Sequence, residues 1–224
     1  MRFQDAARDG RAVVYAGIQA DPLVARAADA LAEATHPERV MARAVMNGES
    51  TDPPTWLAMF PTLLGPDVAD PDRRRAEAVL AASLEVAERG EQVRSQFRGA
   101  IVEALTARLL SRRAGEPSIR RERRILFDGV RAEIHPYDVT VEHDGAAEAW
   151  DCKWGARGIS ADVLHQLDDA RTHAADEGEA LRSGLVIFDA ERSCLVRLGG
   201  LSAPQAGTEI VSLETLDRLA GSGT

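Results

Sequence analysis

The part of the chain with the clearest structural pattern reads YDVTVEHDGAAEAWDCKW and runs from Tyr137 to Trp154. It predicts two strands joined at Asp144-Gly145, because Asp-Gly is a strong signal for a two-residue hairpin turn in which both central residues need a positive φ. Counting outward from this turn places Asp138 opposite Asp151. Directly opposed residues have Cβ atoms about 4.5–5.5 Å apart, so we expect the two carboxylates to lie close together.

This pair of acids predicts a polar corner with room for a metal ion. Two carboxylates at such a separation repel each other unless positive charge lies between them. A hard divalent cation with oxygen ligands is the natural partner. Lys153 lies two residues beyond Asp151 in the same expected strand, so its side chain should point to the same face.

This arrangement resembles the active-site pattern of the PD-(D/E)XK nuclease superfamily, which has the restriction-endonuclease-like fold. The family pattern is an acid on one strand and acid-x-Lys on the next, matched here by Asp138 and by Asp151-Cys152-Lys153. The family often adds a glutamate on the preceding helix, and Glu103 fits that place. One departure is that Pro136 precedes the first acid by two residues instead of one. The resemblance covers roughly residues 92 to 190, in the family's core order of helix, three strands, helix and strand.

The resemblance implies an α/β fold with a restriction-endonuclease-like mixed central sheet flanked by helices. It also implies a bound Mg²⁺, for which Mn²⁺ could substitute, because Mg²⁺ keeps several waters and takes few protein carboxylates. The implied ligands are Asp138, Asp151, the backbone carbonyl of Cys152 and, directly or through water, Glu103. Lys153 would orient the attacking water or neutralise charge that develops in the transition state.

A further catalytic candidate is Gln166, on a helix expected from Ser160 to about Ala175. In several branches of the superfamily a polar residue on this helix reaches the active site. The alternative is that the Gln166 side chain forms a hydrogen bond to backbone at the edge of the sheet.

The function implied by the resemblance is that of a metal-dependent nuclease that hydrolyses phosphodiester bonds. A DNA endonuclease in restriction, repair or defence against mobile elements is the leading hypothesis, and RNA stays open as a substrate. The alternative is a non-catalytic subunit with the nuclease fold that binds DNA or a protein partner in a larger complex. The complete set of Asp138, Asp151 and Lys153 favours the enzyme.

The net charge of −9 and the pI of about 5.1 are unusual for a protein that binds nucleic acid, because phosphates are neutralised by Lys and Arg. Local patches matter more than the total charge. A cluster of four arginines predicts a nucleic-acid-binding patch, formed by Arg120, Arg121, Arg123 and Arg124. The alternative is a solvated strand face whose arginines pair with nearby acids. A homodimer mate or a partner protein could supply further affinity for the substrate.

The 224 residues suit one domain with an extension or two small domains. Residues 1–90 read as a mainly helical accessory region that contacts a partner, a second copy or DNA, and residues 91–224 as the nuclease-like domain. Within the second region, residues 191–198 predict a final strand.

Two cysteines without a Cys-x-x-Cys motif argue against structural zinc and against a secreted disulfide scaffold. The sequence has no apolar leader and no run of membrane-spanning length. We therefore expect a soluble, cytoplasmic protein with no membrane partner.

Overall fold

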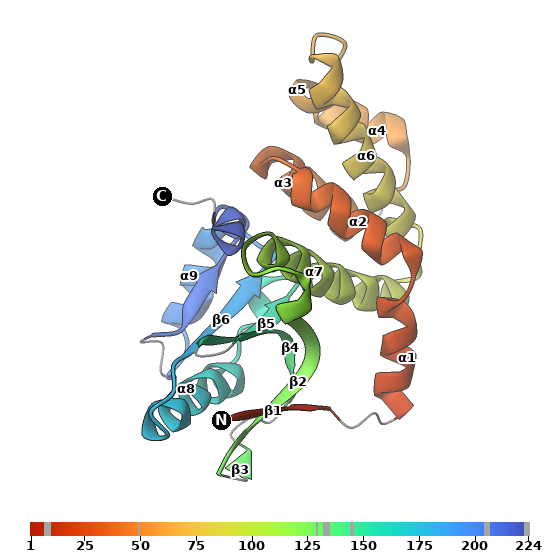
Figure 1. The fold of residues 1–224 in the computed structure, drawn as a ribbon. Helices are drawn as coiled ribbons and strands as arrows, with labels where there is room; N and C mark the ends of the chain where they lie inside the picture. The colour runs from red at the N-terminus through yellow and green to blue at the C-terminus, as the bar shows by residue number, and fades with distance from the viewer. Residues whose placement is uncertain are drawn as a thin grey trace. The chain divides into compact units, whose positions relative to one another are not determined.

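The structure is a computed structural model that describes residues 1–6, 10–48, 50–128, 130–131, 135–143, 146–203 and 207–221. The chain divides into two compact units (Figure 1). The sheet unit consists of Met1–Asp9 and Leu109–Thr224, and the helical unit is Gly10–Arg108.

The helical unit contains a succession of helices, most of which begin at a proline in the first turn. Their bounds are α1 Gly10–Gln19, α2 Pro22–Glu33, α3 His36–Asn47, α4 Pro53–Met59, α5 Pro61–Leu64, α6 Asp70–Ala87 and the first part of α7, Glu91–Ala114. The Asp21 side chain caps α2 by accepting a 2.8 Å hydrogen bond from the backbone N–H of Leu23, as an N-cap aspartate should. Proline suits the following position because its missing N–H would be unsatisfied there in any case. Helices α2 and α3 both pack on α6.

The sheet unit is built on a mixed sheet. Its strands are β1 Arg2–Asp5, β2 Ile119–Phe127, β3 Val130–Arg131, β4 Tyr137–His143, β5 Ala146–Lys153, β6 Leu181–Ile187 and β7 Glu209–Val211. The order across the sheet is β1-β2-β4-β5-β6-β7, and β3 pairs with β2 outside this path. Pairing is antiparallel from β1 to β5 and parallel from β5 to β7. The expected α/β fold with a mixed sheet flanked by helices is confirmed.

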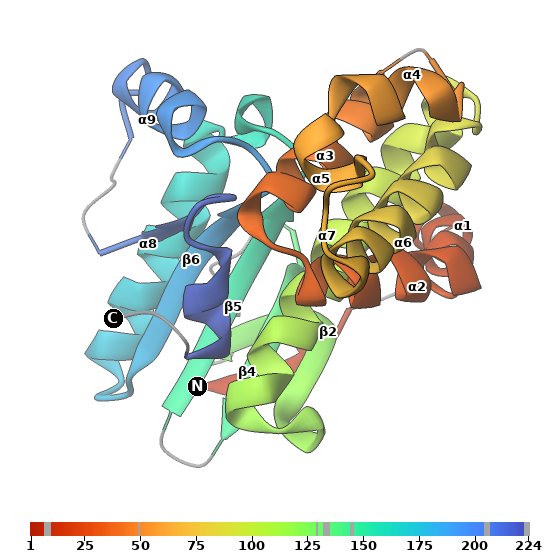
Figure 2. The ribbon, with the colours of Figure 1, turned by 90° about the horizontal axis from the view of Figure 1, so that it is seen from above.

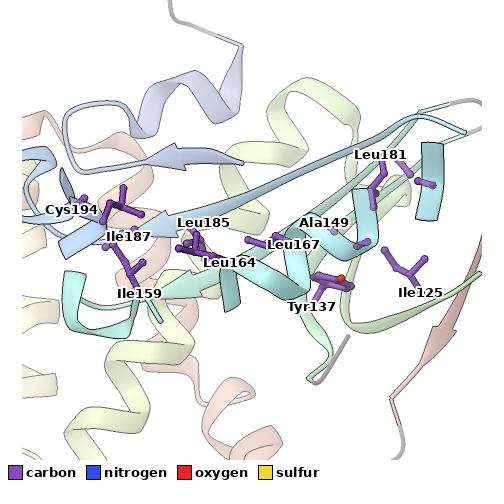
Figure 3. Packing of buried hydrophobic residues seen from close by; sticks show 14 of the residues in the cluster. Ile125, Tyr137, Ala149, Ile159, Leu164, Leu167, Leu181, Leu185, Ile187 and Cys194 are labelled. Atoms are coloured by element: carbon purple, nitrogen blue, oxygen red, sulfur yellow. The ribbon is translucent and has the colours of Figure 1, made fainter. Parts of the chain in front are cut away.

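Among the described residues, this unit also contains the end of α7, the helices α8 Ala161–Asp176 and α9 Glu191–Gly199, and the 3₁₀ turns η1 Glu116–Ser118, η2 Ala156–Gly158 and η3 Leu216–Ala220. Helix α8 lies along β6 (Figure 2). Its apolar stripe includes Leu164 and Leu167, which belong to the same buried cluster as Ala149 and Leu185 of the sheet (Figure 3). Burying one such leucine contributes about 1.5–3 kcal/mol, so this layer holds β5 firmly in place.

The register of the β4–β5 hairpin is the predicted one. The pairs run from His143 and Ala146 outward to Val139 and Trp150. The predicted turn at 144–145 lies outside the described residues. Asp138 and Asp151 occupy the next two facing positions beyond Val139 and Trp150, which places both acids at the same end of the hairpin.

The division between the units differs from the boundary expected after residue 90. Residues 91–108 belong to the helical unit, and the first residues of the chain belong to the sheet. Strand β1 pairs antiparallel with β2, with Phe3 opposite Ile125. Pairing between segments so far apart in sequence leaves no trace in local composition, so residues 1–5 could not be separated from the helices that follow.

The strand predicted over residues 191–198 is wrong, because this segment forms α9. Cys194 and Leu198 are buried whereas Leu195 and Val196 are exposed. In a strand Val196 would share the buried face of Cys194 and Leu198, so its exposure together with their burial is a helical pattern. The apolar run Cys194-Leu195-Val196 is compatible with a strand or a helix by local pattern, and only one of those three side chains is buried.

Candidate active site

The end of the β4–β5 hairpin brings together three of the predicted residues. The ammonium Nζ of Lys153 lies 3.8 Å from Oδ2 of Asp138 and 4.0 Å from Oδ1 of Asp151. The backbone N–H of Cys152 donates a 2.6 Å hydrogen bond to the same Oδ2 of Asp138. One positive charge therefore lies beside two carboxylates, as the hairpin register predicted.

The chain after β5 shapes the surroundings of the lysine. A Cβ at Gly158 would come within 2.9 Å of Cβ of Lys153, so a glycine at this position lets η2 approach the lysine side chain. The buried Asp189 accepts a 3.0 Å hydrogen bond from the N–H of Ala156 and so holds η2. The carbonyl of Lys153 accepts a 2.9 Å hydrogen bond from the N–H of Phe188. These contacts hold the Lys153 backbone and the stem of its side chain.

Burial controls the electrostatics of the two acids. The Asp151 side chain is only 5% exposed. Burial, together with the negative charge of Asp138, raises the pKa of Asp151 to about 7, although Lys153 opposes this shift. Burial also raises the pKa of Asp138, against the effects of Lys153 and the Cys152 N–H. Ionising both Asp138 and Asp151 therefore costs free energy, and a bound cation would reduce that cost.

The donor set fits a hard divalent cation. Asp138 and Asp151 offer carboxylate oxygens, the ligand type that Mg²⁺ and Mn²⁺ prefer. The carboxylate of Asp151 accepts no hydrogen bond from any residue that the structure describes, and its ion-pair contact with the Lys153 ammonium is 4.0 Å long. A buried carboxylate with so few partners is expensive in the metal-free protein. The contribution of the Cys152 carbonyl to such a site stays a prediction.

Glu122 of β2 is a neighbour that sequence reasoning missed. Its carboxylate comes within 4.8 Å of the carboxylate of Asp138. In the sequence Glu122 stands inside a run of arginines, where we interpreted the charges as a nucleic-acid patch. Only the pairing of β2 with β4 shows that this position faces Asp138, and nothing in the local pattern indicates which residues of β2 pair with β4.

Glu103 lies on α7 in the helical unit and is 4% exposed. Its carboxylate accepts a 2.5 Å hydrogen bond from the hydroxyl of Tyr15 and a 2.8 Å hydrogen bond from Nε2 of Gln19. These donors satisfy both oxygens of a buried acid within its own unit. The role of Glu103 as a metal ligand stays a prediction.

Gln166 is buried on α8, and its side-chain amide binds backbone. Oε1 accepts a 3.0 Å hydrogen bond from the N–H of His135, and Nε2 donates a 3.1 Å hydrogen bond to the carbonyl of the same residue. The amide thus binds backbone, as in the alternative to a catalytic role, but the backbone belongs to the segment before β4 instead of the edge of the sheet. The catalytic role of Gln166 stays a prediction. Gln166 holds the chain that leads into β4, three residues before Asp138.

The four candidate arginines lie on β2 in different environments. Arg120 and Arg121 are exposed, and Arg124 is partly buried. Arg123 forms ion pairs with Asp5 and Glu142. For Arg123 the structure shows the pairing with nearby acids that was the alternative interpretation, and nucleic-acid binding by the cluster stays a prediction.

Comparison with models of known protein families gives no match, and neither does a search of curated proteins. Among solved structures, the chain is similar to protein VC1899 from Vibrio cholerae, with 17% sequence identity and a TM-score of 0.42. The alignment covers 98% of this chain and 57% of that one, so the chain spans little more than half the length of the Vibrio protein. Among the described residues, no helix is long and apolar enough to cross a membrane.

Proposed function

We propose that the protein is a metal-dependent nuclease of the PD-(D/E)XK type that hydrolyses phosphodiester bonds. The observation that carries this proposal is the Lys153 ammonium within 4.0 Å of both Asp138 and Asp151 at the end of a strand pair. An acid on one strand facing acid-x-Lys on the next is the arrangement that this chemistry uses. The buried, poorly partnered Asp151 adds support, because a purely structural site would gain nothing from it.

Asp138 and Asp151 would hold Mg²⁺ or Mn²⁺ together with the Cys152 carbonyl. When bound, the cation would supply a Lewis acid for the phosphoryl oxygen and a lowered pKa for water. The N–H of Cys152 holds Oδ2 of Asp138 and so sets the direction of its other carboxylate oxygen. Lys153 would donate hydrogen bonds to the attacking water or to the oxygens that gain charge in the transition state.

DNA is the substrate that we propose, with an endonuclease role in restriction, repair or defence against mobile elements. Arg120 and Arg121 would contact phosphates, because both residues are exposed on β2. The overall charge of −9 limits non-specific attraction. A second copy or a partner protein is therefore part of the proposal as a source of affinity.

The test is cleavage of supercoiled plasmid, linear double-stranded DNA, single-stranded DNA and RNA by the full chain, with Mg²⁺, with Mn²⁺ and with EDTA. Asp151→Asn removes one charge of the site. Asp169→Asn is the matched control, because Asp169 is an exposed acid on α8 of the same unit. We expect metal-dependent cleavage that Asp151→Asn abolishes and that Asp169→Asn retains.

Cleavage that persists in EDTA, or in Asp151→Asn, would contradict the proposal. If the protein binds Mn²⁺ through Asp151 but cuts none of these substrates, the non-catalytic subunit becomes the better interpretation. A pull-down from the source cell would then identify the partner.

A further inference from the structure

A third acid of the sheet unit faces the candidate site. Arg121 of β2 pairs with Val139 of β4, and Arg123 pairs with Tyr137. The positions between these two pairs are Glu122 and Asp138, so the register sets the two acids opposite each other. Their carboxylate oxygens come within 4.8 Å, which is close enough for both to bind one cation.

The backbone of Glu122 is unusual for a residue inside a strand. Its φ is +53°, in the left-handed region that a side chain other than glycine rarely adopts. The strand pairs on either side of it are regular, and its carbonyl accepts a 3.0 Å hydrogen bond from the N–H of Ala6. Such strain persists only where the surrounding structure imposes it, and it is concentrated at functional sites.

Asp151 provides an independent observation that points to a ligand. It is buried, and its carboxylate accepts no hydrogen bond from the residues described by the structure. The negative charge of Glu122 acts on Asp151 in the same direction as that of Asp138. The negative charges of both Asp138 and Glu122 thus act on the buried Asp151 and oppose its ionisation, and a divalent cation would reduce this repulsion.

We propose that Glu122 is a further ligand of the divalent cation held by Asp138 and Asp151. This inference rests on the cation site of the proposed function and deepens it, since the ligand set then comes from three adjacent strands of one sheet. The Glu122 carboxylate lies within 4.8 Å of that of Asp138, at the point where β2 and β4 face each other. The ligand is a hard cation of the Mg²⁺ or Mn²⁺ type, because all the side-chain donors are carboxylate oxygens.

The experiment is calorimetric titration of the metal-free full chain with Mn²⁺ alone. Variants are Glu122→Gln, Asp151→Asn and the control Glu142→Gln, in which the acid removed lies on β4 but is bound by Arg123. We expect Glu122→Gln to weaken Mn²⁺ binding about tenfold or more, in line with the loss of a group that supports a metal site. We expect Glu142→Gln to bind as the wild type does.

Glu122→Asn is the second variant, because asparagine tolerates a positive φ better than most residues. Circular dichroism of each variant verifies the fold. If both Glu122 variants bind Mn²⁺ as tightly as the wild type while Asp151→Asn does not bind, the role of Glu122 is overturned and the cation site stands. If the wild type itself does not bind Mn²⁺, the cation site and the role of Glu122 are both overturned.

Discussion

The side-chain amide of Gln166 satisfies both polar backbone groups of His135, through hydrogen bonds of 3.0 and 3.1 Å. In addition, the hydroxyl of Tyr137 donates a 3.4 Å hydrogen bond to the backbone carbonyl of Gln166. Helix α8 thus holds the segment that enters β4, and with it the position of Asp138. Through these hydrogen bonds Gln166 positions the chain next to the site, and a direct catalytic role for Gln166 stays a prediction.

Gln166→Ala should therefore lower the free energy of unfolding by about 1–3 kcal/mol, because it leaves two backbone groups of His135 without partners. Urea unfolding measures this loss. Gln166→Glu keeps the acceptor for the His135 N–H and loses the donor to the His135 carbonyl. Its free energy of unfolding should therefore lie between those of the wild type and of Gln166→Ala. A Gln166→Ala protein with wild-type stability and no cleavage would instead support the direct catalytic role first considered.

The raised pKa of Asp151 predicts how stability depends on pH. The pKa of Asp151 is about 7 in the folded protein and has its ordinary value of 3.8 in the unfolded chain, so between these values the folded state binds more protons than the unfolded state. The contribution of Asp151 to stability therefore falls as pH rises from about 4 to about 7. In EDTA, Asp151→Asn should remove this contribution. The free energy of unfolding of the variant should therefore rise relative to that of the wild type as the pH increases from about 4 to about 7, by a few kcal/mol at most.

Thermal unfolding of the two proteins at several pH values measures the difference. Other carboxylates titrate in the same range, so the difference between the proteins is the relevant quantity. A constant difference from pH 4 to pH 8 would contradict the shifted pKa.

Lys153 should matter for cleavage more than for metal binding. Lys153→Met keeps much of the apolar stem of the side chain and removes its positive charge. Among the described residues, this is the only positive charge within 4.0 Å of both Asp138 and Asp151. We expect Lys153→Met to bind Mn²⁺ at least as tightly as the wild type does, because the Lys153 ammonium no longer competes with the metal for the two carboxylates. Cleavage should fall about 100-fold or more, as when one group that stabilises the transition state is removed.

Calorimetric titration and single-turnover cleavage separate these two effects. Loss of Mn²⁺ binding in Lys153→Met would show that the lysine shapes the site instead of acting on the substrate.

Arg113 should stabilise the sheet unit through a partly buried ion pair. Its guanidinium donates hydrogen bonds of 2.7 and 2.9 Å to the two carboxylate oxygens of Glu148. Burial opposes ionisation of Glu148, but the hydrogen bonds from Arg113 and Trp150 hold its pKa below the ordinary value. Arg113→Ala should cost about 2 kcal/mol in urea unfolding, since it leaves a buried carboxylate less well compensated.

A double-mutant cycle with Glu148→Gln tests this account. Once Glu148 is neutral, removal of Arg113 should cost less. Equal costs of Arg113→Ala in the two backgrounds would show that the ion pair adds nothing.

The arginines of β2 should differ in their effect on DNA binding. Arg121→Ala removes an exposed charge and should weaken binding on all sequences, reducing the salt dependence by about one phosphate contact. Arg123→Ala should mainly lower stability, because Arg123 is held between Asp5 and Glu142. Fluorescence anisotropy over a range of salt concentrations, combined with urea unfolding, compares the two variants. If Arg121→Ala and Arg123→Ala lost DNA affinity equally and neither lost stability, the different roles predicted for the two arginines would be contradicted.

Local patterns were sufficient for the hairpin and its three polar residues. An Asp-Gly pair predicts a register that needs no information from outside the segment, and alternation along a strand then predicts that Asp138, Asp151 and Lys153 lie together. The start of α2 at Asp21-Pro22 is a local signal of the same kind, because capping acts within one turn. Gln166 was found on its helix, but which backbone group it binds was not evident from the sequence.

Tertiary structure decided the features that depend on pairing between distant segments. The place of β1 in the sheet and the facing of Glu122 and Asp138 both require strand partners that local composition does not reveal. The helix at Glu191–Gly199 needed the core to show which apolar side chains are buried. The raised pKa of Asp151 follows from burial and from charges on neighbouring strands, and both exist only once the chain has folded.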